Sequence, residues 1–418
     1  MSRSKSIKFT KEKRKNQTCK TYQVKIDKSK LNKTSLKHLN SLFLEGKWLY
    51  NNILSTTKDI KTYDTKIKSV SIKVKDNFED RYLKNLSSQM KQGIKDRIFQ
   101  NILNLSAKKK SGYKVGRLKF TSILKCIPLK QYNNTYKIIK SSNRIKIQGV
   151  KQKLKVYGLE QLPKNCEIAN ANLIKKCDDF YISITTYIDK EYKDIPNKSI
   201  GIDFGCETQL TLSNRIKIEY QIPISKQIER LDRKIMKKNR KCSHNKYKDQ
   251  LTREKLYQEL NNKKKDIKDK ITSCLINNYK YVIFQNESIH DWHSGGHGKK
   301  IQNTGIGGII SDLKNKSHTP IMVDKFFPST QLCPVCGKKN KIPEWERIYS
   351  CECGYVEDRD VKSAICIEQE GLKKLVPVER RDVKPKETDA SVDNIFNSLK
   401  RIKNISVSIC REPQLIFN

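Results

Sequence analysis

This sequence has few acidic residues for its basic ones, no long apolar run and no apolar segment near its first residues. Its 418 residues include 44 Asp and Glu against 87 Lys and Arg, so the formal net charge is +43. No run of about 18 apolar residues occurs, which excludes a membrane span. The N-terminal Met-Ser-Arg-Ser-Lys-Ser leads into further charge, whereas a signal peptide needs an apolar segment there. We therefore expect a protein that is neither secreted nor bound to a membrane.

The basic residues are spread along nearly the whole chain. Lys and Arg at this density indicate a polyanionic partner, because neutralising phosphates releases counterions and gives affinity for any sequence. A Lys-rich composition inherited from AT-rich coding is the alternative, although it does not explain why acidic residues are so few. The chain is long enough for two or three domains with substantial cores.

Most cysteines are scattered, but four form two close pairs. The 13 cysteines are an odd number, and this pattern favours a reducing cytoplasm over a disulfide framework. Two thiol pairs separated by a short loop suit a tetrahedral zinc ion, and the glycines after Cys336 and Cys353 suit tight turns. Four unrelated buried thiols are the alternative. We expect a zinc ribbon with one structural Zn²⁺, held by Cys333, Cys336, Cys351 and Cys353.

The first half of the chain alternates strand and helix patterns. Alternating apolar residues predict a strand at Cys19–Asp27 and further strands within 145–156 and 180–184. Apolar residues at helical spacing predict helices at Ser35–Leu54 and around Leu86–Ile102. We therefore expect a β-rich module interrupted by a helical insertion.

Two basic segments are candidates for contact with nucleic acid. In the first, basic residues alternate with Tyr113 and Phe120 around two glycines, a composition that suits phosphates and bases. The second lies in a basic helical region. A solvated charged surface is the alternative for any single residue. The candidates are Lys108, Lys109, Lys110, Lys114, Arg117 and Lys119 in the first segment, and Lys237, Lys238 and Arg240 in the second.

Three carboxylates in the second half follow predicted elements. Alternation in Ile200–Gly205 puts Asp203 on one face of a strand. Beyond a helical hairpin over 225–275, a buried strand ends just before Glu287. Asp360 opens the last predicted helix. These elements predict a mixed sheet, and hence an α+β multidomain fold.

Three other segments carry predictions without a functional residue. We expect a helix at Ile301–Leu313 and a mostly disordered tail over 377–418, where charge, Pro, Ser and Asn dominate. The glycine-rich segment from His290 to His297 holds three histidines. We expect a flexible loop there, which makes a poor metal site.

The three acids suggest a reaction. Carboxylates gathered at one edge of a sheet repel one another unless cations lie between them. Two Mg²⁺ ions about 4 Å apart would let Asp203, Glu287 and Asp360 support hydrolysis of a phosphodiester. This arrangement is typical of an RNase H-like nuclease, whereas a single acid at a strand end is more often a cap or a surface charge.

Four motifs resemble a known family. They are Gly-Ile-Asp-Phe-Gly at 201–205, Asn-Glu-Ser-Ile at 286–289, Phe-Pro-Ser-Thr-Gln-Leu-Cys at 327–333 and Cys-Gly-Tyr-Val-Glu-Asp-Arg-Asp at 353–360. The chain resembles the TnpB proteins, which transposons encode and which are related to the miniature type V CRISPR effector nucleases. The resemblance is strong over residues 195–371 and faint before them.

The resemblance implies a fold and a role for the acids. It implies a RuvC-type, RNase H-like domain in which Asp203, Glu287 and Asp360 bind the metal ions, with the zinc ribbon inserted before Asp360. It also implies an N-terminal β-barrel wedge with a helical recognition insertion. The chain departs from the family at Lys362, where asparagine is commoner. A lysine there either perturbs metal binding or points at a phosphate.

The resemblance also implies an activity and partners. The protein would bind a guide noncoding RNA from its own transposon, pair it with one strand of a target double-stranded DNA, and cut that DNA by metal-dependent hydrolysis. We expect a monomer in the prokaryotic cytoplasm, associated with the nucleoid when bound to DNA. The alternatives are a CRISPR effector of the same fold and a nuclease-inactive, RNA-guided DNA-binding repressor. A DNA-strand transposase is a weaker rival.

The expected domains follow from these boundaries. They are a wedge module in two parts at 1–34 and 113–194, a helical recognition insertion at 35–112, a nuclease domain at 195–327 with its helical hairpin at 225–275, a zinc ribbon at 328–357, a C-terminal nuclease helix at 358–376, and the tail at 377–418.

Overall fold

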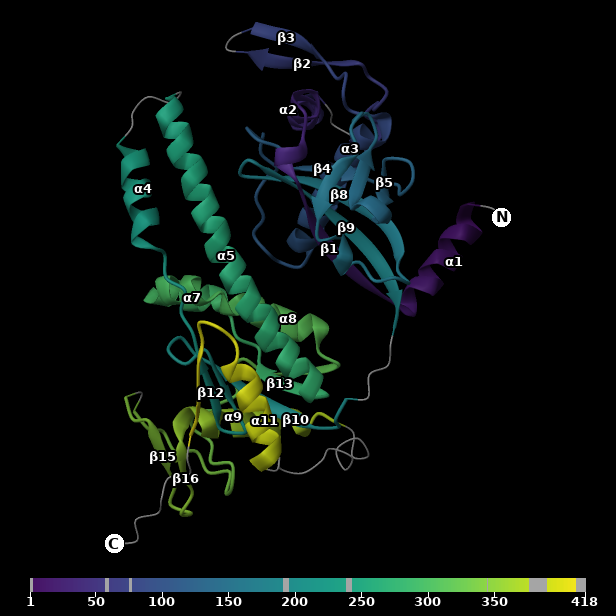
Figure 1. Ribbon diagram of the computed structural model, residues 1–418. Coiled ribbons are helices and arrows are strands. Elements are labelled where there is room, and N and C mark those ends of the chain that lie inside the picture. Colours follow the sequence, from purple (N-terminus) through teal and green to yellow (C-terminus); the bar gives the residue numbers. More distant parts are fainter. Residues whose placement is uncertain are drawn as a thin grey trace. The chain divides into compact units, whose positions relative to one another are not determined.

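The computed structural model describes residues 3–56, 60–74, 77–190, 195–237, 243–343, 345–375 and 389–410. The chain forms two compact units, Met1–Tyr192 and Lys193–Asn418, whose elements are labelled in Figure 1. None of the described helices is long and apolar enough to cross a membrane.

The first unit is built on a seven-stranded antiparallel sheet in the order β4-β8-β9-β1-β7-β6-β5. β1 (Gln17–Ile26) pairs with β9 (Asp179–Asp189) and with β7 (Leu154–Tyr157). Alternate residues are buried along most of β9, in β7 and at the end of β1, which confirms the period-two pattern in the sequence. The remaining strands are β4 (Cys126–Leu129), β5 (Tyr136–Ile139), β6 (Arg144–Ile147) and β8 (Glu167–Lys176).

The insertion between β1 and β4 contains both predicted helices and a hairpin that we did not predict. The helices are α2 (Lys33–Thr56) and α3 (Ser88–Lys110). The hairpin is formed by β2 (Ser69–Val74) and β3 (Asn77–Tyr82), so the insertion is not purely helical. A helix, α1 (Arg3–Lys15), also precedes β1. Its charged sequence gave no apolar stripe from which to predict it.

The second unit is built on a six-stranded mixed sheet in the order β14-β13-β10-β11-β12-β17. Its first three strands are parallel to one another, whereas the other pairings are antiparallel. The strands are β10 (Ser199–Phe204), β11 (Leu210–Leu212), β12 (Ile216–Glu219), β13 (Tyr281–Gln285), β14 (Thr319–Val323) and β17 (Ser406–Ile409).

Helices cover both faces of this sheet. Apolar residues of α5 (His244–Asn278), α8 (Ile306–Lys316) and α11 (Asp389–Lys400) share one buried cluster with Ile200, Ile202 and Phe204 of β10. α9 (Arg359–Leu372) packs on the other face, where its Ile367 joins Ile283 of β13. Asp203 alternates with the buried residues of β10 and therefore lies on the α9 face.

The predicted disordered tail is wrong for its described part. Residues 389–410 contain α11 and the edge strand β17, which pairs with β12. Leu399 is fully buried, and Ile395 and Ile402 are nearly so. The segment looked polar because only every third or fourth residue is apolar, which is the pattern of a helix with one buried stripe. Residues 376–388 and 411–418 lie outside the described residues.

Two predictions around the histidines also need correction. The segment from His290 to His297 is helical, with α6 (Ile289–Trp292) continuing into a π-helical turn over 293–297. The helix predicted at Ile301–Leu313 is broken into α7 (Gly298–Thr304) and α8, because Gly305 adopts a left-handed conformation between them.

The hairpin predicted over 225–275 is present as α4 (Lys226–Met236) and α5, which lie side by side (Figure 1).

Candidate functional site

The structure brings Asp203, Glu287 and Asp360 to one cavity of about 450 Å³ in the second unit. β10 and β13 are parallel neighbours whose register aligns Ile202 with Phe284. Asp203 follows the first of these residues directly and Glu287 lies just past the end of β13. Carboxyl ends of parallel strands lie at the same sheet edge, which is where ligands bind in such sheets.

Asp360 reaches the cavity because α9 lies unusually close to β10. A Cβ atom at Gly201 would collide with the carbonyl oxygen of Ala364 in α9, so only glycine permits this approach. Asp358 caps the helix, since its Oδ1 accepts hydrogen bonds from the backbone N–H groups of Asp360 at 3.0 Å and Val361 at 3.1 Å. Asp360 is thereby held in the first turn, on the side of Asp203.

Burial and neighbouring carboxylates raise the pKa of acids in the cavity. Burial raises the pKa of Asp203 to about 7, and the charges of Asp360 and Glu287 add to the rise. A hydrogen bond with Ser363 opposes it. Burial also raises the pKa of Glu287 against a hydrogen bond with Trp292. A cluster that resists ionisation without a counterion suits divalent cations, and carboxylate oxygens are the ligands that Mg²⁺ prefers.

Cationic side chains line the same cavity. Lys300 of α7 and Arg347 are among them. Glu207 pairs with Lys300 at 3.3 Å and with Arg347 at 2.9 Å. Arg347 also lies 4.0 Å from a carboxylate oxygen of Asp360. The cavity therefore offers carboxylates to metal cations and basic groups to phosphates.

A hydrogen-bond network next to the cavity joins β13, the 325–329 segment and α9. The sequence analysis did not predict it. The amide of buried Gln285 donates to the carbonyl oxygens of Lys325 at 2.8 Å and Phe327 at 2.9 Å. The Ser329 hydroxyl lies 3.3 Å from Gln285 Oε1 and 2.9 Å from the Ser363 hydroxyl. The Phe-Pro-Ser-Thr motif at 327–330 contains Ser329, so it was the part of the sequence that could have indicated this network.

Lys362 does not point at a phosphate in the cavity, although its charge interacts with that of Asp203. Its side chain is fully buried and is not among the residues that line the cavity. The ammonium group donates to the carbonyl oxygen of Ser329 at 3.0 Å and lies 4.1 Å from the centroid of the Tyr349 ring. Burial lowers the pKa of Lys362 to about 8. This lysine joins α9 to the ribbon and does not point at a phosphate.

The four predicted zinc ligands form a tight cluster. Their sulfur atoms all lie within 4.8 Å of one another. Cys333 Sγ is 3.6 Å from Cys353 Sγ, and Cys336 Sγ is 3.6 Å from Cys351 Sγ. A tetrahedron with Zn–S bonds of about 2.3 Å has sulfur atoms roughly 3.8 Å apart, so the donor set fits Zn²⁺.

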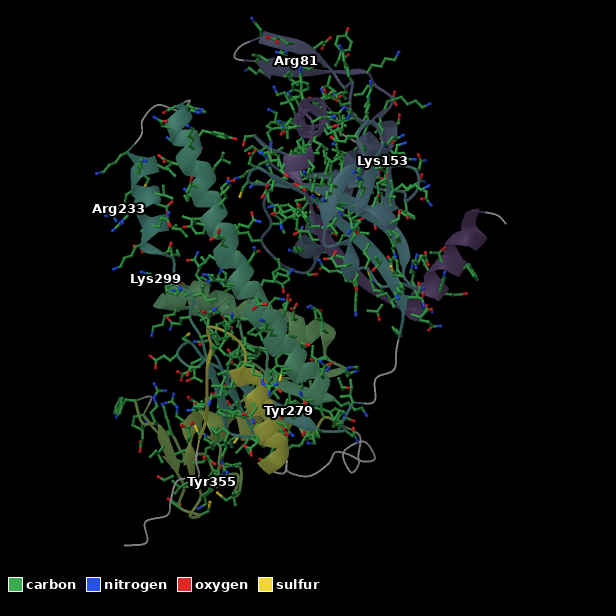
Figure 2. The ribbon with its side chains drawn as sticks, in the orientation of Figure 1. Arg81, Lys153, Arg233, Tyr279, Lys299 and Tyr355 are labelled. Carbon is green, nitrogen blue, oxygen red and sulfur yellow. The ribbon has the colours of Figure 1, made fainter. Side chains whose placement is uncertain are left out.

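The ribbon around this cluster has the predicted turns. Gly337 and Gly354 have φ of 71° and 87°, which is the left-handed region that glycine adopts without strain. β15 (Ile348–Ser350) pairs with β16 (Val356–Asp358) behind the cysteines. Figure 2 labels Tyr355, which precedes β16. Four protein ligands leave no open position, so the metal would be structural.

The predicted nucleic-acid contacts fall into separate places. Lys108, Lys109 and Lys110 form the exposed last turn of α3. The other three candidates in that segment, Lys114, Arg117 and Lys119, are exposed on irregular backbone. In the second unit, Lys237 is exposed at the end of α4, the helix that carries the Arg233 labelled in Figure 2. Lys238 and Arg240 lie outside the described residues.

Comparison with known proteins gives two family models and one curated relative. The Cas12f1-like TNB domain model matches residues 310–367, and the OrfB_IS605 model, described as "Probable transposase", matches residues 179–286. A protein of Streptomyces pristinaespiralis named "Putative RNA-guided DNA endonuclease" is 27% identical over 187 residues, which is 42% of this chain. The match spans 45% of that relative's own length.

A solved structure is also similar. The cryo-EM structure of a Cas12f1–sgRNA–target DNA complex is 13% identical, with a TM-score of 0.41 over 67% of this chain and 70% of that chain. The two family models cover β10 with Asp203, β13 up to the residue before Glu287, and the ribbon with Asp360. Together with the curated relative, they support the resemblance of this chain to the TnpB family.

Proposed function

We propose that this chain is a transposon-encoded, RNA-guided endonuclease that hydrolyses phosphodiester bonds of DNA with Mg²⁺. The observation that carries the proposal is the convergence of Asp203, Glu287 and Asp360, from three distant segments, on one cavity. The name of the curated relative supports the RNA-guided cleavage of DNA. The OrfB_IS605 match supports the origin in a transposon.

The fold of the second unit supports a RuvC-type, RNase H-like domain. Its sheet combines antiparallel and parallel strands, and the carboxylates come from β10, from the end of β13 and from α9. We further propose that the sheet of the first unit is the wedge and that α2, α3 and their hairpin are the recognition insertion. The boundaries proposed from the sequence are retained, except that residues 389–410 join the nuclease domain.

The chemistry divides between the ions and the protein. Two Mg²⁺ ions would activate the attacking water and stabilise the leaving oxygen. Asp203, Glu287 and Asp360 would hold the ions, while Lys300 and Arg347 bind phosphates beside the carboxylates. The network of Gln285, Ser329 and Ser363 limits the movement of these groups, which keeps the reacting groups oriented.

The partners would be a guide noncoding RNA and a target double-stranded DNA. Base pairing between RNA and DNA would supply the sequence specificity, and the basic surfaces of the chain would hold the backbones. The exposed Lys114, Arg117 and Lys119 in the first unit and Lys237 in the second are the proposed contacts.

The test compares the wild-type protein with Asp203→Ala, Glu287→Ala and Asp360→Ala. Each protein receives its copurifying RNA, a matched duplex and Mg²⁺. We expect each substitution to lower the cleavage rate by several orders of magnitude, because the site works only when it is complete. Double variants should be hardly slower than single ones, and guided DNA binding should survive.

Asp312→Ala is the matched control, because Asp312 pairs with Lys268 away from the cavity. It should cleave at close to the wild-type rate. Equal cleavage by the wild type and Asp203→Ala would contradict the site. No cleavage by the wild type, with guided binding intact, would favour the nuclease-inactive repressor.

A further inference from the structure

β12 carries two cations on the face of the sheet where Asp203 lies. Arg215, just before the strand, and Lys217 within it alternate with residues that are buried on the opposite face. Asp203 aligns with Thr211 of β11, and Thr211 aligns with Lys217. Asp203 and Lys217 therefore occupy one row across three strands, on the side that α9 covers.

Both cations hold the junction between the ribbon and α9. Arg215 Nε and Nη2 donate to Glu357 Oε2 at 3.0 and 2.7 Å, and Glu357 is only 1% exposed. Lys217 Nζ donates to Asp358 Oδ2 at 2.8 Å and lies 3.6 Å from Asp360 Oδ2. The Lys217 side chain is 13% exposed, so solvent screens these contacts less than surface pairs.

Asp358 connects Lys217 to the backbone of α9. Its Oδ1 caps the helix through the N–H groups of Asp360 and Val361, and its Oδ2 accepts from Lys217. Holding Asp358 therefore holds the turn that carries Asp360. Lys217 acts on Asp360 twice, once through this cap and once by direct charge.

The backbone of Arg215 supports a specific role for its side chain. Its φ is +70°, an uncommon conformation for a residue other than glycine. Its carbonyl oxygen accepts a hydrogen bond from the N–H of Cys410, just past β17. Glycine or asparagine would adopt this backbone conformation with less strain than arginine. The reason for an arginine at this position is the pairing of its guanidinium with the buried Glu357.

We propose that Arg215 and Lys217, here called the β12 clamp, are positioning residues for Asp360. This inference rests on the proposed function, because it assigns the clamp to the metal-binding acid of that site. The clamp fixes the first turn of α9 against the sheet. Lys217 also places a positive charge beside Asp360, which competes with a divalent cation for that carboxylate.

Lys217→Met separates these two effects. Loss of the charge beside Asp360 should strengthen divalent-ion binding by about tenfold, the size of the repulsion between such charges in water at this range. Loss of the hydrogen bond to Asp358 should lower the cleavage rate at saturating Mg²⁺ by about tenfold or more, because Asp360 is no longer held in place. Lys217→Arg should retain both wild-type properties.

The experiment measures Mn²⁺ binding by calorimetry on the protein–RNA complex without DNA, and then cleavage at saturating Mg²⁺. Lys268→Met is the matched control, because Lys268 forms a similarly shielded ion pair with Asp312 between α5 and α8. It should change neither readout. Lys217→Gln removes the charge with a polar side chain and should also bind Mn²⁺ more tightly. Thermal unfolding of each variant establishes that it is folded.

The outcomes distinguish the clamp from the proposed function. Lys217→Met with wild-type Mn²⁺ binding and rate, in a wild type that cleaves, would overturn the clamp alone. Weaker Mn²⁺ binding by both Lys217→Met and Lys217→Gln, together with a lower unfolding temperature of both, would also overturn it, because it would mean that the lysine only supports the fold. A wild type whose Mn²⁺ binding is unchanged by Asp203→Ala would overturn the proposed site and the clamp with it.

Discussion

At the scale of single residues, Lys362 shows how burial changes the role of a charge. The lysine is fully buried between the Ser329 carbonyl and the Tyr349 ring. Burial lowers the pKa of its ammonium group to about 8. A buried charge is expensive unless it is hydrogen-bonded, and here the carbonyl and the aromatic face are its partners. Its contribution is therefore to the packing of the ribbon on α9.

We expect Lys362→Asn to destabilise the protein more than Lys362→Met. Both variants remove the lysine donor to the Ser329 carbonyl, but the shorter asparagine also leaves a cavity, for a combined cost of about 2–4 kcal/mol. Methionine fills a similar volume without a charge to desolvate, so its cost should be smaller. Urea unfolding of the two variants measures the difference. If both variants lost the same free energy of unfolding, filling the volume of the Lys362 side chain would not matter for stability.

At the scale of elements, the ribbon depends on its metal. We expect Cys333→Ser to lose the bound zinc and to lower the thermal unfolding temperature, because a structural zinc site contributes directly to folding. Metal analysis should find one zinc ion in the wild type and none in the variant. Cys19→Ser, which changes an exposed cysteine of the first unit, is the control and should keep its zinc. A wild type without zinc would contradict this prediction.

The C-terminal segment gives a second prediction at this scale. Leu399 of α11 is fully buried in the cluster beneath the mixed sheet, whereas its neighbour Ser398 is exposed. Leu399→Ala should therefore cost about 2–5 kcal/mol of unfolding free energy, and Ser398→Ala less than about 0.5 kcal/mol. Chemical denaturation compares them. If both variants matched the wild type, the segment would be disordered after all.

At the scale of the whole molecule, the net charge of +43 should appear as a strong dependence of binding on salt. Each phosphate contact contributes about 0.9 to the slope of log affinity against log salt on duplex DNA. Reversing Lys114, Arg117 and Lys119 to Glu should lower both affinity and slope. The same reversal of Lys400, Arg401 and Lys403, which are also exposed, should have a smaller effect. Titrations at several salt concentrations measure the slopes, and a slope near zero would show that the charge is only compositional.

The sequence by itself determined the elements whose signals are local. Period-two burial in β9 follows from alternating apolar residues, and the zinc cluster follows from the spacing of two cysteine pairs. Asp203, Glu287 and Asp360 were named because each follows or opens such an element. Local sequence predicts a strand end well, since alternation is a property of neighbouring residues.

Only the tertiary structure decided what these residues touch. The ion pairs of Lys217 and Arg215 with the residues before Asp360 join segments about 140 positions apart in the sequence. No local pattern encodes such a contact. The segment 389–410 became α11 and β17 because the sheet offers an apolar face and a free edge to cover. Lys362 became a buried residue because Ser329 and Tyr349, from segments distant in the sequence, pack against it. Burial depends on which elements meet, and residues distant in the sequence determine that.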